Sequence, residues 1–105
     1  MAPVVVALVH PLGDLTLLTL EVWSGKTHLR ALGPPAPHPA PPDFLGRLLL
    51  DDNVGTNYSV GTAHAGGSGR EREYAWDFEP ELPWGAHTVT VTETRTGAST
   101  TFSVA

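Results

Sequence analysis

The chain of 105 residues contains no cysteine and few basic residues. Without cysteine there is no disulfide framework and no thiolate metal site, so a packed core must stabilise the fold. Six Lys and Arg stand against eleven Asp and Glu, which gives a net charge of −5. Nucleic acids and anionic membranes recruit clustered positive charge, so neither is predicted as a partner. The length indicates one domain, residues 1–105.

Long hydrophobic runs are also missing. The first apolar run, residues 4–9, is far shorter than the roughly 20 residues that cross a bilayer as a helix, so no membrane insertion is predicted. It has no positively charged leader and no cleavage site typical of a signal peptide. The cytoplasm is therefore the default compartment, with a secreted or surface-attached protein as the alternative if a leader was removed. No cofactor is predicted.

No window of helical length shows a 3.6-residue pattern, whereas many short segments alternate with period two. Residues 48–93 do so on both sides of a glycine-rich tip at 64–69 and are predicted to form paired antiparallel strands. In particular, 56–62 is expected to pair with 44–51. Eight short strands separated by turn signals indicate an all-β antiparallel sandwich of about seven or eight strands. The expected strands are 4–9, 15–23, 26–32, 44–51, 56–62, 74–79, 86–93 and 99–104.

The alternation also predicts which side chains face the core. The aromatic side chains of Tyr74, Trp76 and Phe78 share one face and are the best core candidates. Val89 and Val91 are expected to join them. On strand 15–23, the positions predicted to share a face are Thr16, Leu18, Leu20 and Val22.

Residues 33–42 contain six prolines in ten residues. Proline lacks an amide donor and has a fixed φ, so this segment is predicted to lie outside both helix and sheet interior. We interpret it as an extended connector, about 30 Å long, that carries the chain from one sheet to the other. A docking site for a proline-binding module is the alternative.

The order of several motifs resembles a known group of proteins. The motifs are LEVW at residues 20–23, DDxxGTxY at 51–58, and WxFxPxLPxGA at 76–86. Together these motifs are similar to a group of uncharacterised immunoglobulin-like β-sandwich proteins from high-GC bacteria. The resemblance spans nearly the whole chain and implies an immunoglobulin-like antiparallel sandwich, but no activity, cofactor or site residue. The cysteine pair of antibody-type domains is missing.

Two tryptophans beside predicted turns are the main candidates for ligand binding. Trp84 and Trp23 would suit stacking on a sugar ring or anchoring a partner peptide, with Tyr58 as a third member. The structural alternative is that Trp84 covers one end of the sandwich and Trp23 fills a core or edge position.

The acidic turn at Asp51, Asp52 and Asn53 is a candidate calcium site, because Ca²⁺ takes oxygen ligands from such side chains. The spacing of an EF-hand loop is missing. Asp and Asn are also the residues that ordinary turns favour, since their side chains bond back to the local backbone. Both interpretations stay open at this point.

Nothing in the sequence predicts an enzyme. The five histidines form no close metal-binding pair, and no serine lies in a nucleophile-elbow context. The acidic residues around strand 74–79 are interpreted as a solvated face. We expect a non-enzymatic interaction or accessory module that binds a protein partner, or its own copy through the edge strand 4–9. A carbohydrate- or small-ligand-binding module and a calcium-stabilised adhesion-type domain are the alternatives.

Overall fold

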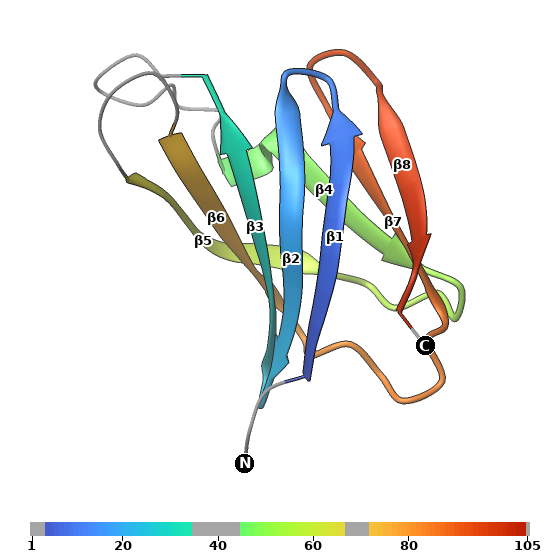
Figure 1. The fold of residues 1–105 in the computed structure, drawn as a ribbon. Coiled ribbons are helices and arrows are strands. Elements are labelled where there is room, and N and C mark those ends of the chain that lie inside the picture. Colours follow the sequence, from blue (N-terminus) through green and yellow to red (C-terminus); the bar gives the residue numbers. More distant parts are fainter. Residues whose placement is uncertain (1–3, 35–44, 67–71, 105) are drawn as a thin grey trace.

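A computed structural model describes residues 4–34, 45–66 and 72–104, which form a sandwich of two antiparallel sheets (Figure 1). The predicted all-β sandwich with eight strands is confirmed. A single turn of 3-10 helix, η1 (Leu45–Arg47), precedes β4. The strands are β1 (Val4–Leu12), β2 (Leu15–Trp23), β3 (Lys26–Gly33), β4 (Leu48–Asp52), β5 (Ser59–Gly66), β6 (Arg72–Glu79), β7 (Thr88–Glu93) and β8 (Ser99–Ser103).

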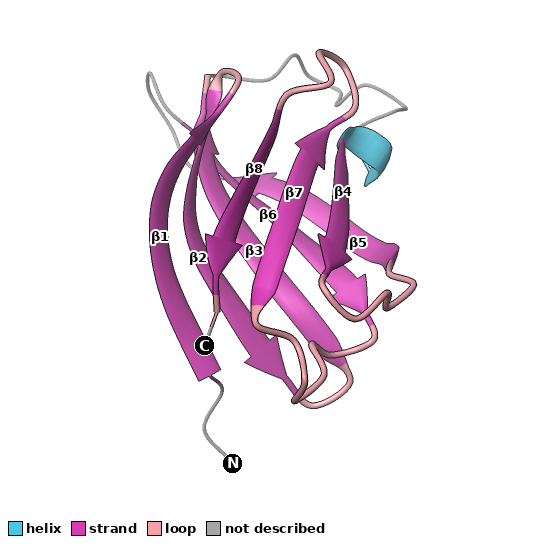
Figure 2. Cartoon of the chain, turned by 90° about the vertical axis from the view of Figure 1, so that its right-hand side faces the viewer, coloured by secondary structure: helices cyan, strands magenta, loops and turns pink. Residues whose placement is uncertain are grey.

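The larger sheet has the strand order β1-β2-β3-β6-β5, and the smaller has β4-β7-β8. Figure 2 shows the smaller sheet in front of the larger one. The chain changes sheet after β3, after β4 and after β6. The first change agrees with the predicted crossing by the proline-rich connector. The conformation predicted for the connector falls on residues 35–44, which lie outside the described residues.

The core lies between the sheets and is built on the alternation of the strands. Tyr74, Trp76 and Phe78 of β6 are at most 1% exposed, as predicted. The rings of Tyr74 and Trp76 stack with centroids 6.0 Å apart. Val89 and Val91 of β7 are fully buried and contribute the facing side of the core. Burial of apolar side chains of this size is the main favourable term in folding.

The predicted pairing of residues 56–62 with 44–51 is wrong. β5 pairs with β6 in the larger sheet, whereas β4 pairs with β7 in the smaller one. The physical reason lies in the loop between β4 and β5. There Asp52 accepts hydrogen bonds from the backbone N–H groups of Val54 and Thr56, which turn the chain away from its own sheet. A tight hairpin would have kept both strands in one sheet.

The face predicted for β2 is also wrong over half of the strand. Its pairing with β3 shifts register between Leu17 and Thr19, which is a β-bulge. Because a bulge adds one residue on one strand, it reverses the alternation on either side. Leu15 and Leu17 are therefore buried before the bulge, and Leu20 is buried after it.

β1 continues past the predicted end of its strand. Pro11 pairs with Thr16, and the edge position explains why a residue without an amide donor is tolerated there. A second register shift falls between Ala7 and His10, where Val9 adopts a φ of 53°. Among the described strands β1 pairs only with β2, so its outer edge is open, and self-association through it stays a prediction.

Three strands, β4, β5 and β7, begin later than predicted. η1 replaces the start of the 44–51 strand, and a turn closed by Ala86 N–H on the Pro83 carbonyl replaces the start of the 86–93 strand.

Glu93 at the end of β7 is 2% exposed and lies 3.9 Å from Arg47. Arg47 in turn contacts Asp14 at 2.5 Å. These charges connect η1 to the β1–β2 turn.

Candidate binding surfaces

Trp84 is the most exposed large apolar side chain at one end of the sandwich. It lies in the turn that follows Pro83, and its relative exposure is 102%, so it covers none of the fold. A fully exposed indole forgoes the roughly 1.5–3 kcal/mol that burial of a large apolar side chain contributes. The structure therefore gives Trp84 no role in core packing.

Hydrogen bonds connect the loop of Trp84 to two other loops. The Asn53 side-chain oxygen accepts from the N–H groups of His87, at 2.7 Å, and of Thr88, at 3.1 Å. Glu81 accepts from the N–H of Gly25 at 3.2 Å. Residues 23–25, 53–58 and 80–87, which we call the loop end, thus form one connected surface toward the lower end of Figure 1.

The loop end gathers exposed apolar side chains. Of the five exposed large hydrophobic side chains among the described residues, Trp23, Val54 and Trp84 all belong to it. Val54 lies beside the Trp84 turn, because a Cβ placed on Gly85 would be 3.8 Å from its Cγ1. Of the three aromatic residues named from the sequence as candidates for ligand binding, Trp84 and Trp23 are thus exposed.

Tyr58 is the exception, because it is half-buried and packs against the core. Its hydroxyl donates a hydrogen bond to the Asp52 carboxylate at 2.8 Å. Burial, this hydrogen bond and the negative charge of Asp52 all raise the pKa of Tyr58. Tyr58 therefore supports the loop end from below and is not part of its exposed surface.

In the acidic turn, the side-chain oxygens of Asp52 and Asn53 accept hydrogen bonds from other groups of the protein. Asp52 accepts from two backbone N–H groups and from Tyr58, while Asn53 accepts from β7 and the preceding loop. Burial alone would raise the pKa of Asp52, but the hydrogen bonds from Thr56, Tyr58 and Val54 outweigh it and lower the pKa. Asp51 is exposed and apart from these contacts. The calcium site stays a prediction, and the turn interpretation accounts for these hydrogen bonds.

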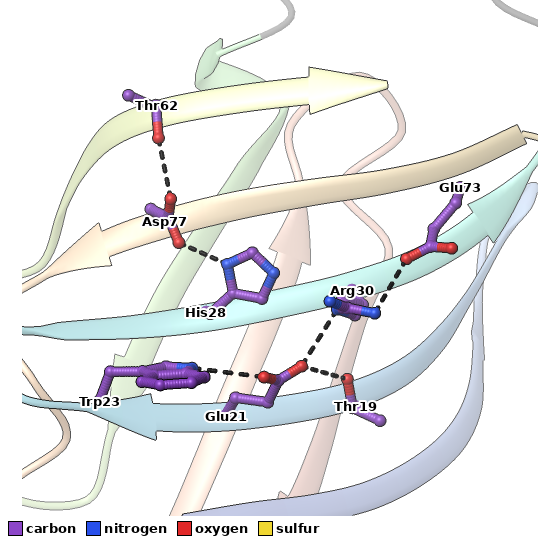
Figure 3. Close-up of polar contacts among 8 residues, drawn as sticks. All are labelled: Thr19, Glu21, Trp23, His28, Arg30, Thr62, Glu73 and Asp77. Carbon is purple, nitrogen blue, oxygen red and sulfur yellow. Dashed lines mark hydrogen bonds and ion pairs between the residues drawn. The ribbon is translucent and has the colours of Figure 1, made fainter. Parts of the chain in front are cut away.

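Trp23 joins the loop end to a second surface, the outer face of the larger sheet, which we call the polar face (Figure 3). Its side chain is 40% exposed, and its indole N–H donates to the Glu21 carboxylate at 3.3 Å. Arg30 on β3 lies between Glu21, at 3.1 Å, and Glu73 of β6, at 3.2 Å. Thr19 also donates to Glu21 at 3.3 Å. The charges of three strands are thus paired across the face.

At the centre of the polar face, the Nδ1–H of His28 donates to the Asp77 carboxylate. The hydroxyl of Thr62 donates to the other oxygen of Asp77 at 3.0 Å. Burial acts to raise the pKa of Asp77, but the hydrogen bonds from His28 and Thr62 and the nearby positive charges lower it overall. The hydroxyl is bonded to the carboxylate and not to the imidazole. These three groups therefore do not form a nucleophile activated by a base.

The His28–Asp77 contact was not predicted from sequence, where Asp77 was assigned to a solvated face. The two residues are 49 positions apart and meet because β3 pairs with β6. His64 of β5 lies close by, with its ring centroid 6.4 Å from that of His28. The other described histidines are apart from this pair: His10 stacks on Phe102 at 5.6 Å, and His87 belongs to the loop end. His38 lies outside the described residues.

Comparisons of the chain with family models, with curated proteins and with solved structures give no match. The resemblance to a group of immunoglobulin-like bacterial proteins therefore stays a prediction. In the part of the chain that the structure describes, no helix has the length and apolar character needed to cross a bilayer.

Proposed function

We propose that this chain is a non-enzymatic, immunoglobulin-like interaction module that binds a protein partner through the loop end. The observation that carries the proposal is Trp84, which is fully exposed on a loop whose His87 N–H, together with Thr88 N–H, donates a hydrogen bond to the Asn53 side chain. Tryptophan is enriched among the residues that dominate binding energy at protein interfaces. A loop that is already ordered also costs less conformational entropy on binding.

The strand order supports the immunoglobulin-like part of the proposal. The constant-type immunoglobulin domain pairs its strands as ABED and CFG. The orders β2-β3-β6-β5 and β4-β7-β8 correspond to these two sheets, with β1 as an additional strand at the A edge. The largest aromatic side chain of the core, Trp76, lies on β6. This differs from antibody domains, in which the buried Trp lies on strand C.

A carbohydrate-binding module is the second candidate, and the surroundings of Trp23 favour it. Its exposed ring lies beside the carboxylate of Glu21, which accepts its indole N–H. A flat apolar ring next to a carboxylate suits a sugar, whose C–H face stacks on aromatic rings while its hydroxyls donate hydrogen bonds. This candidate uses Trp23, whereas the first uses Trp84.

Selection of binders followed by calorimetry distinguishes the two candidates. The wild-type chain is used to select binders from a displayed library of natural protein fragments and from a glycan array. Each binder is then titrated against Trp84→Ala, Trp23→Ala and the control Leu49→Ala. Leu49 is a matched control because it is 50% exposed on β4, away from the loop end.

We expect protein fragments whose affinity falls at least tenfold with Trp84→Ala and is unchanged with Leu49→Ala. Fragments that bind Trp84→Ala as well as wild type would refute the proposal. A glycan whose binding is lost only with Trp23→Ala would establish the carbohydrate module in its place.

A further inference from the structure

The polar face holds a histidine whose orientation is fixed by a carboxylate. His28 donates its Nδ1–H to Asp77, and Thr62 holds the second oxygen of that carboxylate. The other ring nitrogen of His28, Nε2, lies on the side of the ring away from Asp77 (Figure 3). In metal sites, a ligating histidine commonly donates its second N–H to a carboxylate, which fixes the tautomer and makes the ligand more basic.

A second histidine lies within reach of the first across one strand. β6 runs between β3 and β5, and its residue Ala75 pairs with His64 on β5 and with Arg30 on β3. His28 pairs with Asp77, so the two histidines are diagonal neighbours across β6. The ring centroids of His28 and His64 are 6.4 Å apart, with 38° between the ring planes. Two imidazoles bound to one tetrahedral zinc, with Zn–N bonds of about 2.0 Å, would place their centroids about 5 Å apart. The exposed His64 side chain would therefore have to turn toward His28 for both rings to bind one ion.

The charge around the two rings favours a cation. The polar face carries the carboxylates of Glu21, Glu73 and Asp77, and Arg30 lies between the first two of these. The positive charge of Arg30 is therefore already compensated by two carboxylates. Lys26 is the other cationic side chain of β3, and it is exposed at the first position of that strand.

We propose that His28 and His64 form a binding site for a divalent ion that prefers imidazole ligands, of the Zn²⁺ or Cu²⁺ type. Imidazole nitrogen is a preferred ligand of both ions. Asp77 is a positioning residue that holds His28 in the required tautomer. The described residues contain no group of three side chains able to hold a metal by themselves. The ion therefore keeps open positions for water or an outside ligand. This inference is independent of the function proposed for the loop end.

Calorimetric titration of the full chain with zinc chloride at pH 7.5 tests the site. His64→Ala removes one ligand from an exposed position and leaves the hydrogen bond between His28 and Asp77 in place. The matched control is His87→Ala, which removes another exposed histidine from the loop end. We expect His64→Ala to weaken zinc binding at least tenfold and His87→Ala to leave it unchanged. Asp77→Asn should weaken binding by a smaller factor, because it acts through His28.

Nitrogen NMR of the imidazole rings gives a second readout that does not depend on the variants. Zinc should shift the Nε2 resonances of His28 and His64 and leave those of His10 and His87 in place. Absence of binding at millimolar zinc, equal affinity of His64→Ala and wild type, or shifts confined to other histidines would each overturn the proposal. The melting temperature of each variant without metal shows whether it is folded.

Discussion

Replacing Asn53 with alanine would cut the two hydrogen bonds that join the β4–β5 loop to the start of β7. The side-chain oxygen of Asn53 accepts from His87 N–H at 2.7 Å and from Thr88 N–H at 3.1 Å. A typical intramolecular hydrogen bond contributes about 0.5–1.5 kcal/mol net. All three residues are exposed, so water replaces part of what is lost. We therefore expect the free energy of unfolding to fall by about 1 kcal/mol in total, at the low end of the range for two bonds.

Asn53→Ala should loosen the loop end more than it destabilises the whole fold. Hydrogen exchange measures opening residue by residue, and the amides of His87 and Thr88 should lose protection while those of the β6 core keep theirs. Urea unfolding gives the global change. Asn57→Ala is the matched control, because Asn57 is exposed in the same loop and its side chain makes no hydrogen bond with the described residues. Asn53→Asp, which keeps an acceptor oxygen, should restore much of the protection.

The same variants test whether the loop of Trp84 is held in place. The chain has three tryptophans, so indole NMR relaxation can report on each ring separately. In Asn53→Ala, the indole of Trp84 should become more mobile while that of Trp76 is unchanged. If the two Asn→Ala variants behave alike in exchange, in unfolding and in relaxation, then Asn53 does not hold the loop end together, and the reasoning is refuted.

Three further predictions concern the fold and its response to pH. In Gly33→Ala, the new Cβ would lie 2.6 Å from Leu15 Cδ2 and 3.0 Å from the Tyr74 ring, and both side chains are buried. We expect the free energy of unfolding, measured in urea, to fall by roughly 1–3 kcal/mol. Gly66→Ala has open space around its Cβ and should be near neutral. The pKa of Asp52 is lowered in the folded state, so the ionised carboxylate stabilises the fold at pH values above the ordinary Asp pKa near 3.8. This stabilisation is lost as the pH falls below that value. Asp52→Asn should therefore flatten the acid limb of the stability–pH profile. The pKa of Tyr58 is raised in the folded state, so the tyrosine hydroxyl loses its proton more readily in the unfolded chain. The free energy of unfolding should therefore fall as the pH rises above about 10. Tyr58→Phe should remove this pH dependence, and an unchanged dependence would contradict the contact with Asp52.

Local patterns predicted the parts of the fold that depend on local geometry. The alternation of Tyr74, Trp76 and Phe78 identified the core face of β6, because every second side chain of a regular strand faces the same way. The same rule failed on β2, where the bulge after Leu17 reversed the faces. No residue in that stretch is a glycine or proline that would have signalled a bulge.

The choice of sheet could not be predicted in the same way, because it depends on contacts between distant residues. The segment 56–62 has strand character, but whether it pairs with β4 or with β6 depends on the loop that follows Asp52. The candidate sites show the same limit. His28 and Asp77 are unremarkable in the sequence and meet only because β3 and β6 are neighbours in the sheet.

Trp84 and Trp76 show why exposure, and not residue type, decides what a tryptophan does in this chain. Trp76 is fully buried, and truncation of such a side chain in a core typically costs about 3–5 kcal/mol. Trp84 is fully exposed, so the fold gains nothing from the size of its ring. Its loop is nevertheless held in place, because the N–H groups of His87 and Thr88 donate hydrogen bonds to the Asn53 side chain. An ordered loop that presents an indole without using it for stability is the arrangement expected of a contact residue, and this is why the proposed function rests on Trp84.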